Sequence, residues 1–263
     1  MLINRVLVAL PLLAAAGAIF WRGAPWMWET ATFVAALWAL WEWGRLGGLR
    51  GRAAAGYAAL SAAFMLAGKF LLDGNLGAAD AMFGGACLFW ATAAPALMLS
   101  GFPLRRAAFY AAGMLTIFAA WYASAVMFVN DPDALLAVLA VVWTADSAAY
   151  FVGRRWGKKQ MSPRISPGKT WEGFFGGMFC ALTLAFLCGP LLFVAPPPAW
   201  LLAATAAVVA LAVLGDLFES EIKRRGGVKD SGGVLGAHGG VLDRLDAMLP
   251  ALPFGALLSP WLN

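Results

Sequence analysis

The stretch AAFYAAGMLTIFAAWYASAVMFV, residues 107–129, contains no charged side chain. A bilayer core about 30 Å thick needs about 20 apolar residues in a helix that rises 1.5 Å per residue. The stretch is therefore long enough to cross a membrane once. Small residues recur in it and two-residue alternation is absent, which favours a helix over a strand of a membrane barrel.

Comparable apolar runs fill most of the chain, which has 263 residues, is 62% hydrophobic and has a mean hydropathy of +0.76. The other runs cover 5–21, 26–44, 53–72, 79–100, 134–153, 172–194, 199–218 and 247–262. We therefore predict an all-α integral membrane protein, a polytopic bundle of about nine transmembrane helices. The last run is short enough to be tilted or partly interfacial. The first is either a cleaved signal peptide or a retained helix, and the many later spans favour retention.

Basic residues predict the orientation, because short cytoplasmic loops retain Lys and Arg. With the N-terminus in the cytoplasm and the C-terminus outside, only Arg22 and Lys69 of the 19 basic residues fall outside. The others are Arg5, Arg45, Arg50, Arg52, Arg105, Arg106, Arg154, Arg155, Lys158, Lys159, Arg164, Lys169, Lys223, Arg224, Arg225, Lys229 and Arg244. The net charge of +5 then comes from basic residues on the cytoplasmic side of the membrane. No nucleic-acid-binding module accompanies these residues.

Polar residues concentrate in the second half of the chain. We divide the whole chain into residues 1–130, with about five transmembrane helices, and residues 131–263, a catalytic region with cytoplasmic loops 153–173 and 219–246. The first loop reads GRRWGKKQMSPRISPGKTWEG. Its cations, with Ser166 and Thr170 beside Lys169, predict an anion site next to a helix start. A nucleotide P-loop is excluded, because Pro163 stands where that motif needs glycine. The flanking arginines and lysines have a simpler alternative, contact with anionic lipid.

The second loop begins inside a helix as GDLFESEIKRRGGVKDSGGVLGAHGGVLDRLD, residues 215–246. Helical spacing places Asp216, Ser220 and Lys223 on one face, and Asp243 and Asp246 one turn apart at the start of the last helix. Two helix ends that carry carboxylates can converge, and such ligands suit Mg²⁺ or Mn²⁺ rather than zinc. Seven glycines lie in residues 226–240, where backbone amides can approach a phosphate. A flexible surface loop is the alternative, and the flanking charges favour a phosphate and metal site.

Among the acids in or beside apolar runs, where an ionised group is costly, four more need an interpretation. Asp146 and Glu172 are functional candidates: Asp146 to orient a basic side chain or a metal-bound water, Glu172 to cap the helix that follows the first loop. An internal polar tie between helices is the competing interpretation. Glu42 and Asp80 have no motif around them, and we interpret them as interhelical ties or interface residues.

Residues 215–246 resemble the signature of the CTP:phosphatidate cytidylyltransferases, the CDP-diacylglycerol synthases of bacterial inner membranes. The segment DSAAYFVGRRWGKKQMSPRISPGKTWEG, residues 146–173, is similar to the family's second shared block. Together the blocks cover about a quarter of the chain. Gly236-Ala237 stands where the family pattern has Pro-Gly, and Ala148 where it has glycine. These departures affect loop rigidity and close packing rather than the charged groups.

The resemblance implies transfer of a cytidylyl group from CTP to phosphatidate, giving CDP-diacylglycerol and pyrophosphate, in phospholipid synthesis at the bacterial inner membrane. It implies metal coordination by Asp216 and Asp243, with Asp246 a further ligand or a neighbour of one. One Mg²⁺ or two would suit the reaction, and Mn²⁺ is the alternative ion. His238 either donates to the leaving pyrophosphate or holds the loop. The implied catalytic residues are Asp216, Asp243, Lys223 and His238. The implied substrate-binding residues are Ser166, Lys169, Thr170, Ser220, Arg224, Lys229, Asp230, Arg244 and Asp146.

The expected partners are CTP, phosphatidate and membrane lipids, and the sequence leaves a homodimer open. A transporter would also place acids in interrupted helices, but it predicts matching interruptions in two chain halves, which are absent. A lipid-binding scaffold would not need the paired aspartates. CTP-dependent transfer to another lipid phosphate, or a polyprenol kinase, is the nearest alternative.

Overall fold

The computed structural model describes residues 14–100, 105–192, 198–232 and 239–261. Residues 14–22 are helical. The labelled helices are α2 (Pro25–Leu46), α3 (Arg52–Leu72), α4 (Leu76–Leu88), the π-helical turn η1 (Phe89–Ala93), α5 (Ala94–Ser100), α6 (Arg106–Asn130), α7 (Pro132–Trp156), α8 (Trp171–Leu192), α9 (Pro198–Arg225), α10 (Leu242–Leu245), α11 (Met248–Leu258) and the 3₁₀ turn η3 (Ser259–Trp261). Every apolar run after the first thus contains a helix.

Six described helices are long and apolar enough to cross a membrane: α3, the rod of α4, η1 and α5, and α6, α7, α8 and α9. The chain is therefore a polytopic helical bundle, and the described residues give six such helices where the sequence predicted about nine. Part of the first predicted run, residues 5–13, lies outside the described residues. The 22-residue helix α2 carries Glu29, Glu42 and Arg45 and is not among the six.

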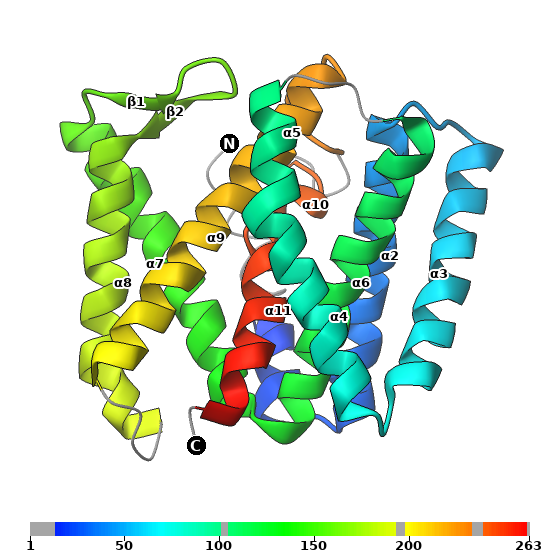
Figure 1. Ribbon diagram of the computed structural model, residues 1–263, viewed down its shortest axis with the longest axis horizontal. Helices are drawn as coiled ribbons and strands as arrows, with labels where there is room; N and C mark the ends of the chain where they lie inside the picture. The colour runs from blue at the N-terminus through cyan, green and yellow to red at the C-terminus, as the bar shows by residue number, and fades with distance from the viewer. Residues whose placement is uncertain (1–13, 101–104, 193–197, 233–238, 262–263) are drawn as a thin grey trace.

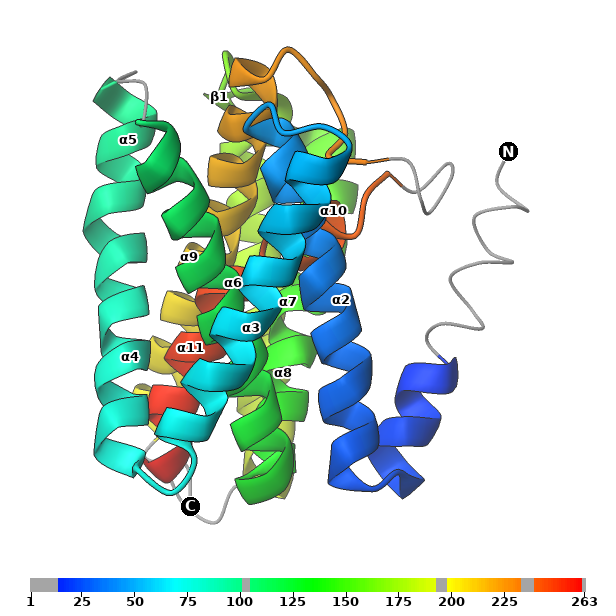
Figure 2. The same cartoon turned by 90° about the vertical axis from the view of Figure 1, so that its right-hand side faces the viewer.

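The helices run side by side, and α9 crosses the others diagonally (Figure 1). One end of the bundle, uppermost in Figure 1, collects the ends of α5, α7 and α9 and the start of α8. The side view shows α4 and α5 on the opposite flank from α2 (Figure 2). Both polar loops of the sequence therefore lie at the same end, which we call the motif end.

The last helix is short. The run 247–262 was predicted as a span short enough to be tilted or partly interfacial, and α11 has 11 residues, or about 16 Å of rise. It lies at the centre of the bundle, in contact with α6, α9, α4 and α7, and begins below the motif end (Figures 1 and 2). The described residues just before α11, among them Leu242 and Ala247, are therefore buried within the bundle. Irregular backbone is tolerated at such depth where protein surrounds it.

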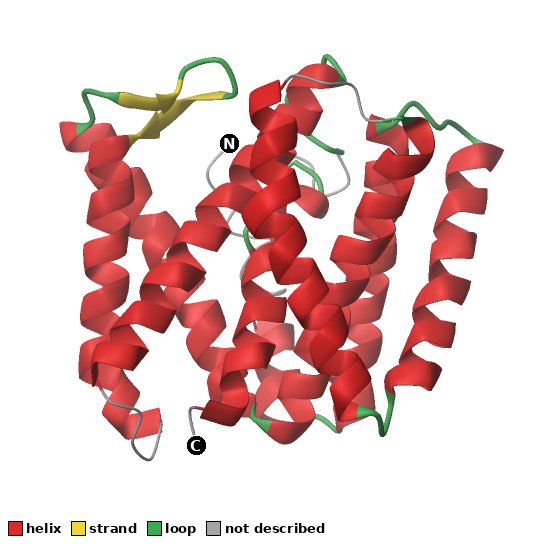
Figure 3. Cartoon of the chain, viewed as in Figure 1, coloured by secondary structure: helices red, strands yellow, loops and turns green. Residues whose placement is uncertain are grey.

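A two-stranded hairpin occupies part of the first loop, where the sequence predicted no strand. Strand β1 (Gln160–Ser162) pairs antiparallel with β2 (Ser166–Thr170), and the hairpin covers the motif ends of α7 and α8 (Figure 3). Below it α7 and α8 pack backbone to backbone. A Cβ at Gly173 would lie 2.8 Å from the Ala149 carbonyl oxygen. Small residues on α8 thus hold the two helices close.

Candidate functional site

An open cavity with about 980 Å³ of empty space lies between α7, α8, α9, α10 and β2. Seven of the residues predicted from the sequence line it: Asp146, Lys169, Thr170, Asp216, Asp243, Arg244 and Asp246. Tyr150, which the sequence did not single out, lines it as well. The two motif segments therefore meet at one cavity at the motif end.

An ion pair connects the two motif segments directly. The Lys169 ammonium, on β2, lies 2.6 Å from a carboxylate oxygen of Asp216 on α9, and both side chains are about one quarter exposed. Ser220 donates to the other oxygen of Asp216 across 3.3 Å, as the i, i+4 spacing predicted. The Thr170 hydroxyl accepts from the Gly173 N–H at 3.1 Å and thereby caps the start of α8.

Asp246 approaches Asp216 because Gly215 has no side chain. A Cβ at Gly215 would overlap the Asp246 carbonyl oxygen and lie 2.8 Å from Cδ of Pro250. Asp246 Oδ1 accepts from the Ala247 N–H at 2.7 Å. Burial raises the pKa of Asp246 well above its ordinary value, and the nearby Asp216 carboxylate raises it further. Two carboxylates thus share one wall of the cavity, an arrangement that a cation would stabilise.

Lys223 lies between two carboxylates instead of facing open space. Its ammonium pairs with Glu219 one turn earlier and lies 2.7 Å from Asp243. Asp243 also accepts from the N–H groups of Ser231, at 3.2 Å, and Gly240, at 2.7 Å. Burial alone would raise the pKa of Asp243, but the hydrogen bonds from Lys223 and from the Gly240 N–H, with the charge of Lys223, hold it below its ordinary value. Lys223, which the resemblance implied as a catalytic residue, is therefore held within an ionic cluster.

The side chains near the cavity can be compared with the ligands that the predicted Mg²⁺ needs. Within the described ranges, no three Asp, Glu, Cys or His side chains group closely enough to hold an ion alone. Mg²⁺, however, is usually bound through one or two carboxylates and completes its shell with waters and substrate phosphates. Asp216 and Asp246, both lining the cavity, supply two such ligands. The residues therefore fit a Mg²⁺ that shares its shell with a phosphate ligand.

Several predicted site residues lie away from the cavity lining. Arg224 Nε donates to the Ile165 carbonyl at 3.3 Å, which ties α9 to the hairpin. Ser166 pairs with Ser162 in the hairpin. Lys229 and Asp230 are exposed in the loop after α9, and His238 lies outside the described residues.

Glu172 lies in the first turn of α8, where the sequence placed it as a candidate cap, and it also contacts the turn before the hairpin. Its carboxylate accepts from the N–H groups of Lys158 and Lys159, at 3.1 Å, and so fixes the turn between α7 and the hairpin. Asp146 lines the cavity that Lys169 also lines.

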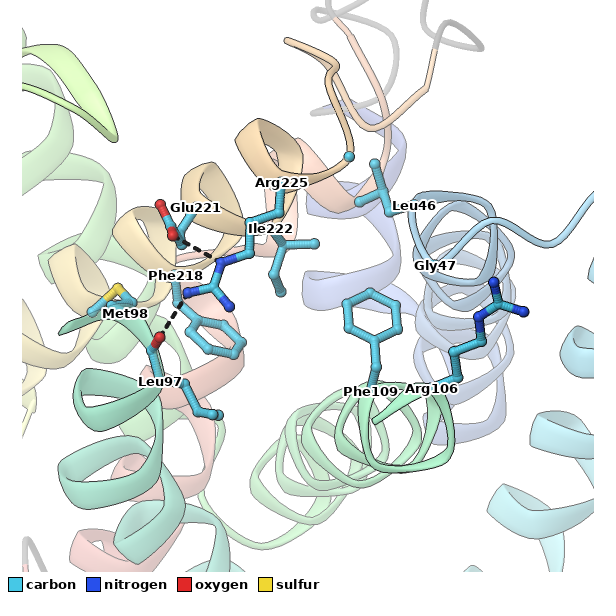
Figure 4. Close-up of a pocket in the computed structure, with 11 residues that line it drawn as sticks. Leu46, Gly47, Leu97, Met98, Arg106, Phe109, Phe218, Glu221, Ile222 and Arg225 are labelled. Atoms are coloured by element: carbon cyan, nitrogen blue, oxygen red, sulfur yellow. Dashed lines mark hydrogen bonds and ion pairs between the residues drawn. The ribbon is translucent and has the colours of Figure 1, made fainter. Parts of the chain in front are cut away.

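The sequence also did not predict a group of contacts that joins α9 to the hairpin and to α5. We call this group, formed by Glu221, Arg225 and Arg164, the latch. Glu221 accepts from Arg225 at 2.8 Å and from Arg164 of the hairpin at 3.2 Å. The same arginines donate to the carbonyls of Leu97 and Met98 near the end of α5. Figure 4 shows the pairing of Arg225 with Glu221 and Leu97 beside a second cavity. The latch fixes the hairpin, and with it Lys169, relative to α9.

Gly215→Ala is expected to destabilise the protein, although alanine is the better helix former. The added methyl group would push Asp246 and Pro250 away from α9, and such overpacking costs about 1–3 kcal/mol. The thermal unfolding midpoint of the detergent-solubilised protein measures the effect. Gly56→Ala, in α3 with open space around the new Cβ, is the matched control. Equal midpoints for both variants would contradict the close approach of Asp246 to α9.

Comparisons with known proteins agree with the resemblance of the two motif segments. A model described as the Cytidylyltransferase family matches residues 3–260. The phosphatidate cytidylyltransferase of Pseudomonas aeruginosa is 38% identical over an alignment of 291 positions, which covers 98% of this chain and 97% of that relative. Those of Haemophilus influenzae and Bacillus subtilis are 48% and 47% identical over 46% and 43% of this chain, and over 43% and 42% of their own lengths. The chain belongs to the Cytidylyltransferase family.

Proposed function

We propose that the protein transfers the cytidylyl group of CTP to phosphatidate, giving CDP-diacylglycerol and pyrophosphate. The observation that carries this proposal is the 2.6 Å ion pair between Lys169 and Asp216, which brings both motif segments to one cavity beside Asp246. The names of the relatives support the same reaction. The nearly full-length alignment with one of them extends that support beyond the motifs.

In this reaction a phosphate oxygen of phosphatidate attacks the α-phosphorus of CTP. A new P–O bond forms, and the bond between the α-phosphorus and the bridging oxygen breaks, so that pyrophosphate leaves with the electron pair. A phosphomonoester has a second pKa of about 6 and is largely dianionic near neutrality. It therefore needs positioning more than a general base, and no covalent enzyme intermediate is required.

The charged residues of the cavity have distinct roles in this proposal. Lys169 and Arg244 line the cavity and bind phosphate oxygens. Asp216 and Asp246 would hold Mg²⁺, and Asp243 lines the same cavity. When bound, Mg²⁺ offsets the charge that gathers on phosphoryl oxygens in the transition state. Lys223 neutralises the carboxylates of Glu219 and Asp243 and keeps the loop in place.

We further propose that the motif end faces the cytoplasm, in the inner membrane of a bacterium. The N-terminus then lies inside, and about nine helices enter the membrane if the first run and the short α11 are included. Basic residues support this orientation, since Arg45 closes α2, Arg106 opens α6 and Arg225 closes α9, all at the motif end. Lys69 lies in the last turn of α3, at the opposite end. CTP and the lipid headgroup would thus reach the cavity from the same side.

Position-specific labels in CTP test the reaction. Purified protein is incubated with Mg²⁺, phosphatidate vesicles and CTP labelled at the α- or the γ-phosphate. The α-label is expected in lipid and the γ-label in pyrophosphate, and chelation of the metal with EDTA is expected to abolish both. The γ-label in lipid would mean a kinase. Turnover with another lipid phosphate but not with phosphatidate would change the acceptor, and no turnover with any acceptor would favour the transporter.

A further inference from the structure

Glu42 belongs to the N-terminal half of the chain, yet its carboxylate contacts the glycine-rich loop that carries the second motif. The side chain is fully buried on α2. It accepts hydrogen bonds from the Ser231 hydroxyl at 2.9 Å, the Val241 N–H at 3.2 Å and the Leu242 N–H at 2.8 Å. Almost 200 residues of sequence separate these partners from Glu42. The carboxylate thus replaces the water that two loop amides and a hydroxyl would otherwise need.

Two glycines of the loop allow this contact. A Cβ added at Gly232 would meet Glu42, whose atoms are its three nearest neighbours, and a Cβ at Gly240 would meet Glu42 and Ser231. Neither glycine has a positive φ. Their common requirement is therefore close approach of the backbone to the carboxylate rather than an unusual conformation.

The loop is held from its other side by Asp243. Asp243 accepts from the N–H groups of Ser231 and Gly240, while Glu42 accepts from the Ser231 hydroxyl and from the N–H groups of Val241 and Leu242. The two acids thereby fix both ends of the segment 231–242. Leu242 is the first residue of α10, and the next two residues, Asp243 and Arg244, line the cavity.

We infer that Glu42 is a positioning residue for the active site: it fixes the loop that aims Asp243 and Arg244 into the cavity. A tie between long helices would need a partner on another such helix. Each of the three hydrogen bonds described for Glu42 goes instead to the loop or to the start of α10. Through this residue α2, in the N-terminal half of the chain, supports the site. This inference rests on the proposed function.

Glu42→Gln tests the contact between Glu42 and the loop, with little change of side-chain volume. The carboxamide keeps one acceptor oxygen and presents an NH₂ group to at least one loop donor, so a buried hydrogen bond is lost. Amide hydrogen exchange at Val241 and Leu242 is expected to accelerate at least about tenfold, and kcat to fall about 10–100-fold. Asp80→Asn replaces an exposed acid on α4 and is expected to stay within about twofold of the unmodified protein in both measurements.

A double variant separates positioning from general stability. Gly232→Ala presses a methyl group against the Glu42 carboxylate, and Glu42→Asp withdraws that carboxylate by about one methylene. Each single variant is expected to lose activity. The double variant is expected to be at least about threefold more active than the product of the two single losses, since the shorter acid makes room for the methyl group. Multiplicative losses, or a Glu42→Gln variant with unchanged kcat, would overturn the inference.

The outcomes also distinguish the inference from the proposed function. If the unmodified protein forms no CDP-diacylglycerol while exchange at Val241 and Leu242 accelerates in Glu42→Gln, the proposed function fails and the loop contact stands. If the unmodified protein is active and Glu42→Gln changes neither exchange nor kcat, the proposed function stands and the positioning role fails.

Discussion

Asp216→Asn is expected to lower kcat at least about 1,000-fold, because it removes a charge that the transition state requires on the metal side of the cavity. Asparagine preserves the shape of the side chain and can still accept the hydrogen bond from Ser220. It no longer pairs with Lys169 and binds a hard divalent ion weakly. The fold is expected to survive, since loss of one charge also relieves repulsion between Asp216 and Asp246.

Steady-state kinetics with CTP and phosphatidate, over a series of Mg²⁺ concentrations, measure the effect of this substitution. The matched control is Asp133→Asn, which replaces an exposed acid in the first turn of α7 and is expected to leave kcat within about twofold. Full activity of Asp216→Asn at saturating Mg²⁺ would remove Asp216 from the proposed metal site. A large loss that high Mg²⁺ restores would assign it to ion affinity alone.

The sequence predicted most of the helices because apolar length is a strong signal in a bilayer. It said less about the last run, since hydropathy does not distinguish a helix that crosses the membrane from a short buried one. Ala251 and Leu249 of α11 are apolar because α11 lies inside the bundle. The hairpin was also missed, because Ser166-Pro167-Gly168 has the composition of a turn, and only pairing with residues 160–162 makes it a strand.

The candidate site could be predicted where its residues follow local spacing. Asp216 and Ser220 are in contact as the i, i+4 rule predicted, and Lys169, a substrate-binding residue by the resemblance, lines the same cavity as Asp216. Contacts between distant segments left no such signal. Glu42 was recognisable as a costly charge in an apolar run, but nothing in its neighbourhood pointed to Ser231 or Leu242. Glu219 lies four residues before Lys223, so the same spacing favours their ion pair, whereas the contact of Lys223 with the distant Asp243 left no signal.

Lys223→Met is expected to have the largest effect on stability. The Lys223 ammonium lies between Glu219, whose side chain is 2% exposed, and Asp243, at 11%. Methionine is close to lysine in volume and leaves two carboxylates facing each other without a cation. Removing one partner of a buried charge cluster costs about 3–5 kcal/mol. We expect a lower unfolding midpoint in detergent and loss of turnover, because the loop held by Asp243 would shift.

A second substitution separates the charge from the shape of this cluster. Glu219→Gln combined with Lys223→Met removes one cation and one anion, so the net charge of the cluster matches that of the unmodified protein. The double variant is expected to regain most of the lost stability. It is expected to remain poorly active, because Asp243 still lacks the ammonium that orients it. If Lys223→Met alone unfolds at the temperature of the unmodified protein, the cluster is hydrated and Lys223 is free to bind phosphate. If instead the double variant regains stability and turnover together, Lys223 acts only as a counter-ion for Glu219, and Asp243 needs no ammonium to keep the loop in place.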